Sequence, residues 1–149
     1  MTRIFHFIFS FCFIIQINYA QNLPDLRIFL TEKNNHPKTD WLINPTPYKA
    51  KIFKSKDGKS IFLHNGLIYR EIRLTPNAAT VGFDNLMTGE TIIRGVKPEG
   101  EITINGKHYL IGGLTGQSNY AFLKKEWIDE LEVDSNSLVF KLIRCFTNA

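Results

Sequence analysis

Disulfide chemistry is nearly excluded by composition, because the 149-residue sequence has only two cysteines, Cys12 and Cys145. Cys12 lies in an N-terminal apolar run that we expect to be removed. One thiol then remains, with no partner for it within the chain. The disulfide-stapled architecture of small secreted domains is therefore excluded. A folded domain of this length has to be stabilised by buried apolar area instead.

Several functional signatures are missing as well. The sequence has no glycosylation sequon and no spacing of His, Cys and carboxylates typical of a metal site. It also lacks the glycine-rich phosphate loops and the nucleophile elbow of hydrolases. Its 18 Lys and Arg against 14 Asp and Glu are scattered rather than clustered. We therefore expect no metal, no cofactor and no nucleic-acid partner.

The one long apolar run lies at the N-terminus, from Phe5 to Ile17, after the single charge of Arg3. A charged start, a short apolar core and a small residue at the exit are typical of a secretory signal. The run is shorter than the ~20 residues of a transmembrane helix, and an uncleaved anchor is the alternative. Residues 1–20 are thus predicted to be a signal peptide, cleaved near Ala20 to give a secreted or periplasmic chain.

Residues 21–48 are predicted to form an irregular lead-in segment. They hold four of the six prolines, and proline fixes φ and removes a backbone donor. Within this segment, Leu26–Leu30 predicts a short edge strand. Trp41 and Tyr48 are expected to hold the segment against the domain that follows.

From Ala50 onward the pattern becomes that of antiparallel strands. Asp57-Gly58, Asn65-Gly66 and Asn105-Gly106 each lie between β-branched or aromatic runs, where such dipeptides favour hairpin turns. Asn65-Gly66 is the strongest type I′ signal of the three. Residues 49–149 are therefore predicted to form a mostly β domain, an antiparallel β-sandwich built from hairpins.

One short helix is predicted near residues 120–131, where Leu123, Trp127 and Leu131 recur at a spacing of four residues. The last segment, Leu138–Phe146, is apolar on both faces and predicts a covered strand. Because it lies at the C-terminus of the chain, the domain is expected to be truncated there.

Arg70 shares one face of its predicted strand with Ile68 and Ile72, since successive side chains alternate between faces. It is expected either at the rim of a sheet or beside a carboxylate. The rim is favoured, because a lone buried charge is costly.

Asp84 ends one predicted strand and Glu90 begins the next, in the stretch FDNLMTGET. Glycoside hydrolysis needs two carboxyl groups on either side of the bond to be cleaved. The same stretch, with Asn85 and Gly89, also has the residues that a tight connection requires. The sequence favours the connection, so no catalytic residue is expected in this chain.

The region from Asp40 to Leu131 resembles the N-terminal region of large bacterial secreted glycoside hydrolases of the α-galactosidase type, similar to glycoside hydrolase family 36. The segments that carry the resemblance are NGLIYREIRL, PNAATVGFDNLMTGE, GVKP and GGLTGQ. It implies an antiparallel β-sandwich that precedes a catalytic (β/α)₈ barrel. The chain has no room for a barrel of ~250 residues. The resemblance therefore implies a non-catalytic domain, a fragment without its barrel.

In such enzymes, loops of the sandwich reach a sugar pocket. Asp84 and Asn85, with the aromatic Trp41, are accordingly the candidate carbohydrate-binding or pocket-edge residues. A free-standing carbohydrate-binding module is the alternative function, and an independent enzyme using Asp84 and Glu90 is a third. The expected partners are a carbohydrate, a barrel domain or second chain over Leu138–Phe146, and another copy of the chain.

Overall fold

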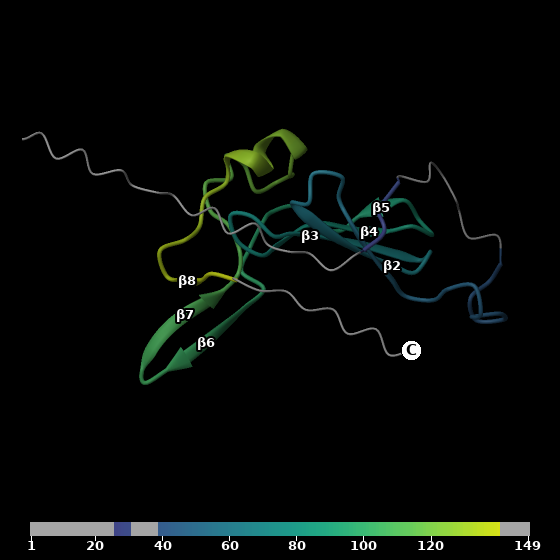
Figure 1. Cartoon of the computed structure of the whole chain (residues 1–149), viewed down its shortest axis with the longest axis horizontal. Coiled ribbons are helices and arrows are strands. Elements are labelled where there is room, and N and C mark those ends of the chain that lie inside the picture. Colours follow the sequence, from purple (N-terminus) through teal and green to yellow (C-terminus); the bar gives the residue numbers. More distant parts are fainter. Residues whose placement is uncertain (1–25, 31–38, 141–149) are drawn as a thin grey trace, which may run out of the picture.

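The fold is mostly β, as predicted, and its described part consists of two sheets and one short helix (Figure 1). The computed structural model describes residues 26–30 and 39–140; the predicted signal peptide and Cys145 lie outside them. Sheet A has five strands in chain order, each antiparallel to the next: β1 (Lys51–Lys54), β2 (Ser60–His64), β3 (Ile68–Arg73), β4 (Ala79–Asn85) and β5 (Glu90–Thr91). Sheet B has three: β6 (Gly100–Ile104), β7 (Lys107–Ile111) and β8 (Ser137–Leu138).

The three predicted hairpins are confirmed, but their turns differ. Asn105 and Gly106 both have positive φ, 51° and 77°, as a type I′ turn requires. At the β2–β3 connection only Gly66 has positive φ. The side chain of Asn65 instead accepts hydrogen bonds from the N–H groups of Leu67 and Ile68, both at 2.9 Å. The type I′ prediction for Asn65-Gly66 is therefore wrong, because Asn65 acts through its side chain.

Sheet B departs from the predicted antiparallel pattern, because β8 runs parallel to β7 and pairs Leu110 with Ser137. A parallel pair needs a long connection between its strands. Here the connection passes through the helix η1 (Lys125–Glu130). The predicted strand Leu138–Phe146 is described only to Phe140. Its first residue, Leu138, is 41% exposed rather than covered.

The predicted helix is shorter than expected and is a 3₁₀ helix of six residues. It packs on the core through Ile128, while Leu123 and Leu131 flank it on the same core. This core joins β4 to the segment before β6, the segment after β7 and the helix. Its buried members are Ala79, Val81, Val96, Leu114, Ile128 and Leu131. Trp127 is half-buried, with its ring 5.3 Å from that of Phe122. The described residues contain no helix long and apolar enough to span a membrane.

The lead-in segment is irregular where it is described, as predicted. The predicted edge strand Leu26–Leu30 is reduced to one parallel bridge, between Ile28 and Lys54. Tyr48 lies against Gly66, where an added Cβ would come within 3.3 Å of its ring. Trp41 is 43% exposed. Tyr48 therefore holds the segment in place, while the same role for Trp41 stays a prediction.

Two buried amides tie the loops together. The side chain of Asn77 donates to Ser137 and Leu138 and accepts from the N–H groups of Ala78 and Phe140. This places β8 beside β7. Gln117 makes four hydrogen bonds of the same kind around the core. Both amides have all their partners supplied by the backbone or one hydroxyl, so they can be buried without a large desolvation cost.

Candidate functional site

The strand register decides how the two predicted carboxylates lie. Asn85 is directly opposite Glu90 on β5, while Asp84 is opposite Thr91. Residues directly opposite one another share a face of a sheet, and neighbours along a strand alternate. Asp84 and Glu90 therefore point to opposite faces of sheet A. They cannot act together on one glycosidic bond, which weakens the hypothesis of an independent enzyme.

Asn85 serves the connection between β4 and β5. Its side chain accepts a hydrogen bond from the N–H of Met87 at 3.0 Å, and its carbonyl accepts one from Gly89 at 2.8 Å. Gly89 has a φ of 72°, which glycine adopts at little cost. The turn chemistry that the sequence favoured for this stretch is thus present, and the side-chain oxygen of Asn85 is already engaged.

Asp84 lies in a small polar cluster with Tyr69 and Glu71, which we call the Asp84 cluster. Tyr69 is directly opposite Asp84 on β3, and its hydroxyl donates to Glu71 at 2.9 Å. Gly82 makes this close packing feasible, because a Cβ there would come within 3.3 Å of both neighbouring side chains. Within the described residues, the Asp84 carboxylate makes no hydrogen bond or ion pair. It can therefore accept hydrogen bonds from an added hydroxyl group.

The tyrosine of this cluster is held protonated. Burial is the main cause, and the charge and hydrogen bond of Glu71 and the charge of Asp84 add to it; together they raise the pKa of Tyr69. On the same face, Phe29 of the lead-in segment packs against Phe62 and Tyr69, with ring centroids 4.8 and 5.6 Å apart. The Asp84 cluster is thus a hydrogen-bond-donating and -accepting site at the edge of an aromatic cluster, suited to recognition rather than to bond cleavage.

The third predicted site residue, Trp41, lies at the same end of sheet A as Asp84 and Asn85. Tyr48 connects the two regions, since its ring lies on Gly66 and its hydroxyl donates to the carbonyl of Thr39. No hydrogen bond, ion pair or ring contact joins Trp41 to Asp84 or Asn85 within the described residues. The three predicted residues therefore lie at one end of the sheet without a polar or ring interaction between Trp41 and the other two.

Arg70 has a carboxylate partner, contrary to the expectation that it would lie at the rim of a sheet. Its guanidinium pairs with Glu99 at 2.5 Å and with the hydroxyl of Thr80 at 2.7 Å. Glu99 also accepts from the backbone N–H of Thr80. β3 is the central strand of sheet A, and Arg70 was the one charge on an apolar face. That placement was the signal that a partner was needed.

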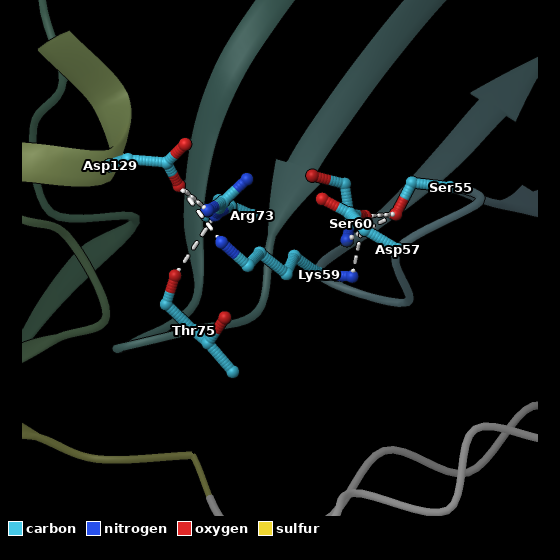
Figure 2. Close-up of polar contacts among 7 residues, drawn as sticks. All are labelled: Ser55, Asp57, Lys59, Ser60, Arg73, Thr75 and Asp129. Carbon is cyan, nitrogen blue, oxygen red and sulfur yellow. Dashed lines mark hydrogen bonds and ion pairs between the residues drawn. The ribbon is translucent and has the colours of Figure 1, made fainter. Parts of the chain in front are cut away.

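A second charged group joins the helix to sheet A, and Figure 2 shows it. Asp129 of η1 pairs with Arg73 of β3 and with Lys59, the latter at 3.3 Å. Arg73 also donates to the carbonyl of Thr75. The hydrogen bond of Lys59 and then the charges of Arg73 and Lys59 lower the pKa of Asp129. All three charges serve the docking of η1, so we assign them a structural role.

We expect the Lys59→Gln and Arg73→Gln variants each to move the pKa of Asp129 upward, toward that of an ordinary carboxyl group. Because the folded-state pKa of Asp129 is lowered, its ion pairs stabilise the fold above the ordinary carboxyl pKa. That contribution is lost as the pH falls through the lowered pKa. An NMR pH titration of the Asp129 carboxyl carbon measures the shift. Lys56→Gln, an exposed change in the same loop, should leave it unchanged; equal shifts in all three variants would contradict the assignment.

The concave feature beside sheet B is small. No three His, Cys, Asp or Glu side chains among them are placed to hold a metal ion. One open cavity of about 120 Å³ lies between the end of β7 and the loops before β6 and after β7, lined by Lys97, Tyr120 and Asp134 among others. Ligand pockets are usually ~300–1,000 Å³. One face of the Tyr120 ring is taken by the Lys97 ammonium, 4.2 Å from the centroid, so this ring is not a free platform for a sugar.

The chain matches no protein-family model, and neither a curated protein nor a solved structure shows significant similarity to it. The relationship to α-galactosidase-like glycoside hydrolases therefore stays a prediction from the residues that carry the resemblance.

Proposed function

We propose that this chain is a non-catalytic β domain of a secreted α-galactosidase-like glycoside hydrolase, which acts together with a catalytic barrel from another domain or chain. The opposite orientations of Asp84 and Glu90 are in keeping with a non-catalytic role. The observation that supports the proposal most directly is the exposed, mainly apolar face of sheet B.

One face of sheet B is mainly apolar and the other is mainly polar. Register places Ile102 opposite Tyr109, while their neighbours Thr103 and His108 form the next pair and point the other way. The mainly apolar face consists of Ile102, Ile104, Tyr109, Ile111 and Leu138, with the charged Lys107 at its edge, opposite Ile104 and 5.1 Å from the Tyr109 ring. Ile102, Ile104 and Leu138 are 40%, 46% and 41% exposed. Contiguous apolar surface of this kind marks a contact with another protein unit, and we assign it to the barrel.

The test uses the chain from Gln21 and the barrel polypeptide that we expect the neighbouring coding sequence to specify. The two polypeptides should co-purify, and only the complex should hydrolyse an aryl α-galactoside. The double variant Ile102→Lys, Ile104→Lys should weaken the complex by tenfold or more, because two charges would be buried against apolar surface. Calorimetric titration of one polypeptide into the other measures this.

A matched control lies on the same strand. Glu101→Lys with Thr103→Lys adds two lysines to the opposite face of β6 and should leave the affinity within about twofold. The proposal fails if no neighbouring sequence encodes a barrel, or if the two pairs of substitutions have equal effects. Hydrolysis by the isolated chain that is lost in Asp84→Asn would revive the independent enzyme.

The alternative is a free-standing carbohydrate-binding module centred on the Asp84 cluster. It is supported by the Asp84 carboxylate, which lies opposite Tyr69 and has no hydrogen-bond partner among the described residues. In this case the isolated chain should bind galactosides or cell-wall glycans in calorimetric titrations. Binding should be lost in Asp84→Asn and kept in Glu90→Gln, whose side chain lies on the opposite face. Sugar binding that both variants retain would exclude the Asp84 cluster as the site.

A further inference from the structure

We propose that the turn Trp41–Ile43, which we call the apolar turn, inserts into the interfacial layer of a lipid bilayer. This proposal does not depend on the proposed function. It rests on the exposure of the turn, on how its backbone is hydrogen-bonded, and on what lies beside it at the same end of sheet A.

The apolar turn exposes three consecutive large side chains. Trp41, Leu42 and Ile43 are 43%, 73% and 82% exposed. Single exposed apolar residues are ordinary on a protein surface, but adjacent ones form a patch that marks an interaction. Tryptophan with aliphatic residues is also the composition that favours the interface between water and lipid tails.

The shape of the turn is fixed by its own hydrogen bonds. The Asp40 side chain accepts from the N–H of Leu42 at 2.9 Å, and the Asp40 carbonyl accepts from Ile43 and Asn44. The Tyr48 hydroxyl donates to the carbonyl of Thr39 and so closes the base of the loop. The three apolar side chains are thus presented outward by an ordered backbone.

The backbone donors of this loop are all accounted for from residue 42 to residue 48. Five N–H groups have acceptors within the loop, and the two remaining positions are prolines, which have no N–H. The bonded donors are Leu42, Ile43, Asn44, Thr46 and Tyr48, and the prolines are Pro45 and Pro47. Backbone groups that enter a lipid phase must be satisfied internally, because no water is available to them. The N–H groups of residues 42–48 meet that condition before any ligand is bound.

Two neighbouring loops at the same end of sheet A have the same properties. In Figure 1, the β2–β3 and β4–β5 loops lie at the end of sheet A that faces the lead-in segment, which is drawn in blue. Ile68 is 44% and Met87 45% exposed, and the N–H groups of both are bonded to asparagine side chains. The N–H of Leu86 donates to Leu67 and joins the two loops. Several apolar tips at one end of a sheet suit a flat surface.

A lipid surface fits this end better than a sugar or a protein pocket does. The apolar turn is convex, and a fluid phase can surround side chains that point in several directions. A sugar needs free polar groups around the aromatic ring, whereas the side chains of Asp40 and Asn44 are engaged in the turn. Lys49 and Lys51 are exposed where the loop enters β1, and they suit anionic head groups.

The experiment uses the chain from Gln21, because the apolar run before it would bind lipid by itself. In a Trp127→Phe background, Trp41 is the only tryptophan. We expect its fluorescence to shift to shorter wavelength on phosphatidylcholine vesicles, and binding to strengthen several-fold with phosphatidylglycerol. Leu42→Ser with Ile43→Ser should weaken vesicle binding by roughly tenfold or more. Both side chains are exposed, so the far-UV circular dichroism should not change.

The matched control is Ile92→Ser with Val139→Ser, which removes two exposed aliphatic side chains outside the apolar turn and should leave vesicle binding unchanged. The proposal is overturned if Trp41 emission does not shift on vesicles, or if the two double variants lose binding equally. It is also overturned if soluble galactosides, rather than vesicles, shift the emission, since Trp41 would then be a sugar platform.

Discussion

Replacing Gln117 by Glu is expected to destabilise the protein by about 3–4 kcal/mol at neutral pH. The two N–H groups of the Gln117 amide are shared among three carbonyl oxygens, those of Arg94, Asn119 and Phe122, at 2.6–3.1 Å from the nitrogen. In the Glu variant, a carboxylate oxygen would face these three oxygens in a site where Gln117 is only 7% exposed. Burying an unpaired charge against acceptors is among the costliest single changes.

The effect should depend on pH in a defined direction. Burial and the surrounding carbonyl oxygens would raise the pKa of the introduced carboxyl group above its unfolded value of about 4.3. A group whose folded pKa is raised contributes stability below the unfolded pKa and loses it as the pH rises through the folded pKa. The difference in unfolding free energy between Gln117→Glu and the native protein should therefore be smaller at pH 4 than at pH 8.

Urea denaturation of both proteins across this pH range measures that difference. Gln117→Met is the control, since it keeps the length of the side chain and adds no charge. It should cost a constant amount at every pH, because three carbonyls and the N–H of Val96 lose their partner. A Glu variant whose loss does not change with pH would contradict the buried position of this amide.

Replacing Gly112 by Ala is expected to prevent stable folding or to cost at least about 4 kcal/mol. Two effects add. The φ of Gly112 is 62°, which an L side chain adopts at a cost of about 1 kcal/mol. An added Cβ would also overlap the carbonyl oxygen of Ala78, which accepts the N–H of Gly113. The Ala78 carbonyl cannot move aside without breaking its hydrogen bond to the Gly113 N–H, which links the start of β4 to the residues after β7.

Gly106→Ala separates these two effects. Gly106 also has positive φ, 77°, but a Cβ added there would have nothing within 4 Å of it. It should therefore cost only about 1 kcal/mol. Thermal unfolding followed by circular dichroism compares the two variants, and a similar loss of stability in both would show that the close approach at Ala78 is not decisive.

Local pattern was sufficient to predict the hairpins. Asp57-Gly58, Asn65-Gly66 and Asn105-Gly106 each join two strands, because glycine at these places adopts positive φ and the flanking residues suit a pleated sheet. The turn type at Asn65 was not predictable from the dipeptide, since a side-chain acceptor replaced the expected backbone geometry. The predicted helix is a short 3₁₀ helix, and only Ile128 of its core residues lies within it. Leu123 and Leu131 pack on the same core from the residues before and after the helix, so they do not form one helical stripe.

The candidate site was only partly accessible from the sequence. Asp84 and Asn85 are where the sequence placed them, at the end of a strand. The partners of Asp84 come from another strand, however, and Tyr69 and Glu71 are adjacent to it only because of the register of β3 against β4. The same holds for Arg70 and Glu99, which are 29 residues apart. No pattern within one strand specifies such pairs.

The sequence by itself determined the mostly β class, the positions of the hairpins and the glycines at their turns, because these depend on neighbours along the chain. The tertiary structure alone decided that Asp84 and Glu90 face opposite sides of sheet A. It also decided that β8 lies parallel to β7 and that the apolar turn at Trp41 is exposed. These outcomes depend on register and on which surfaces meet, and both are set by contacts between residues far apart in the chain.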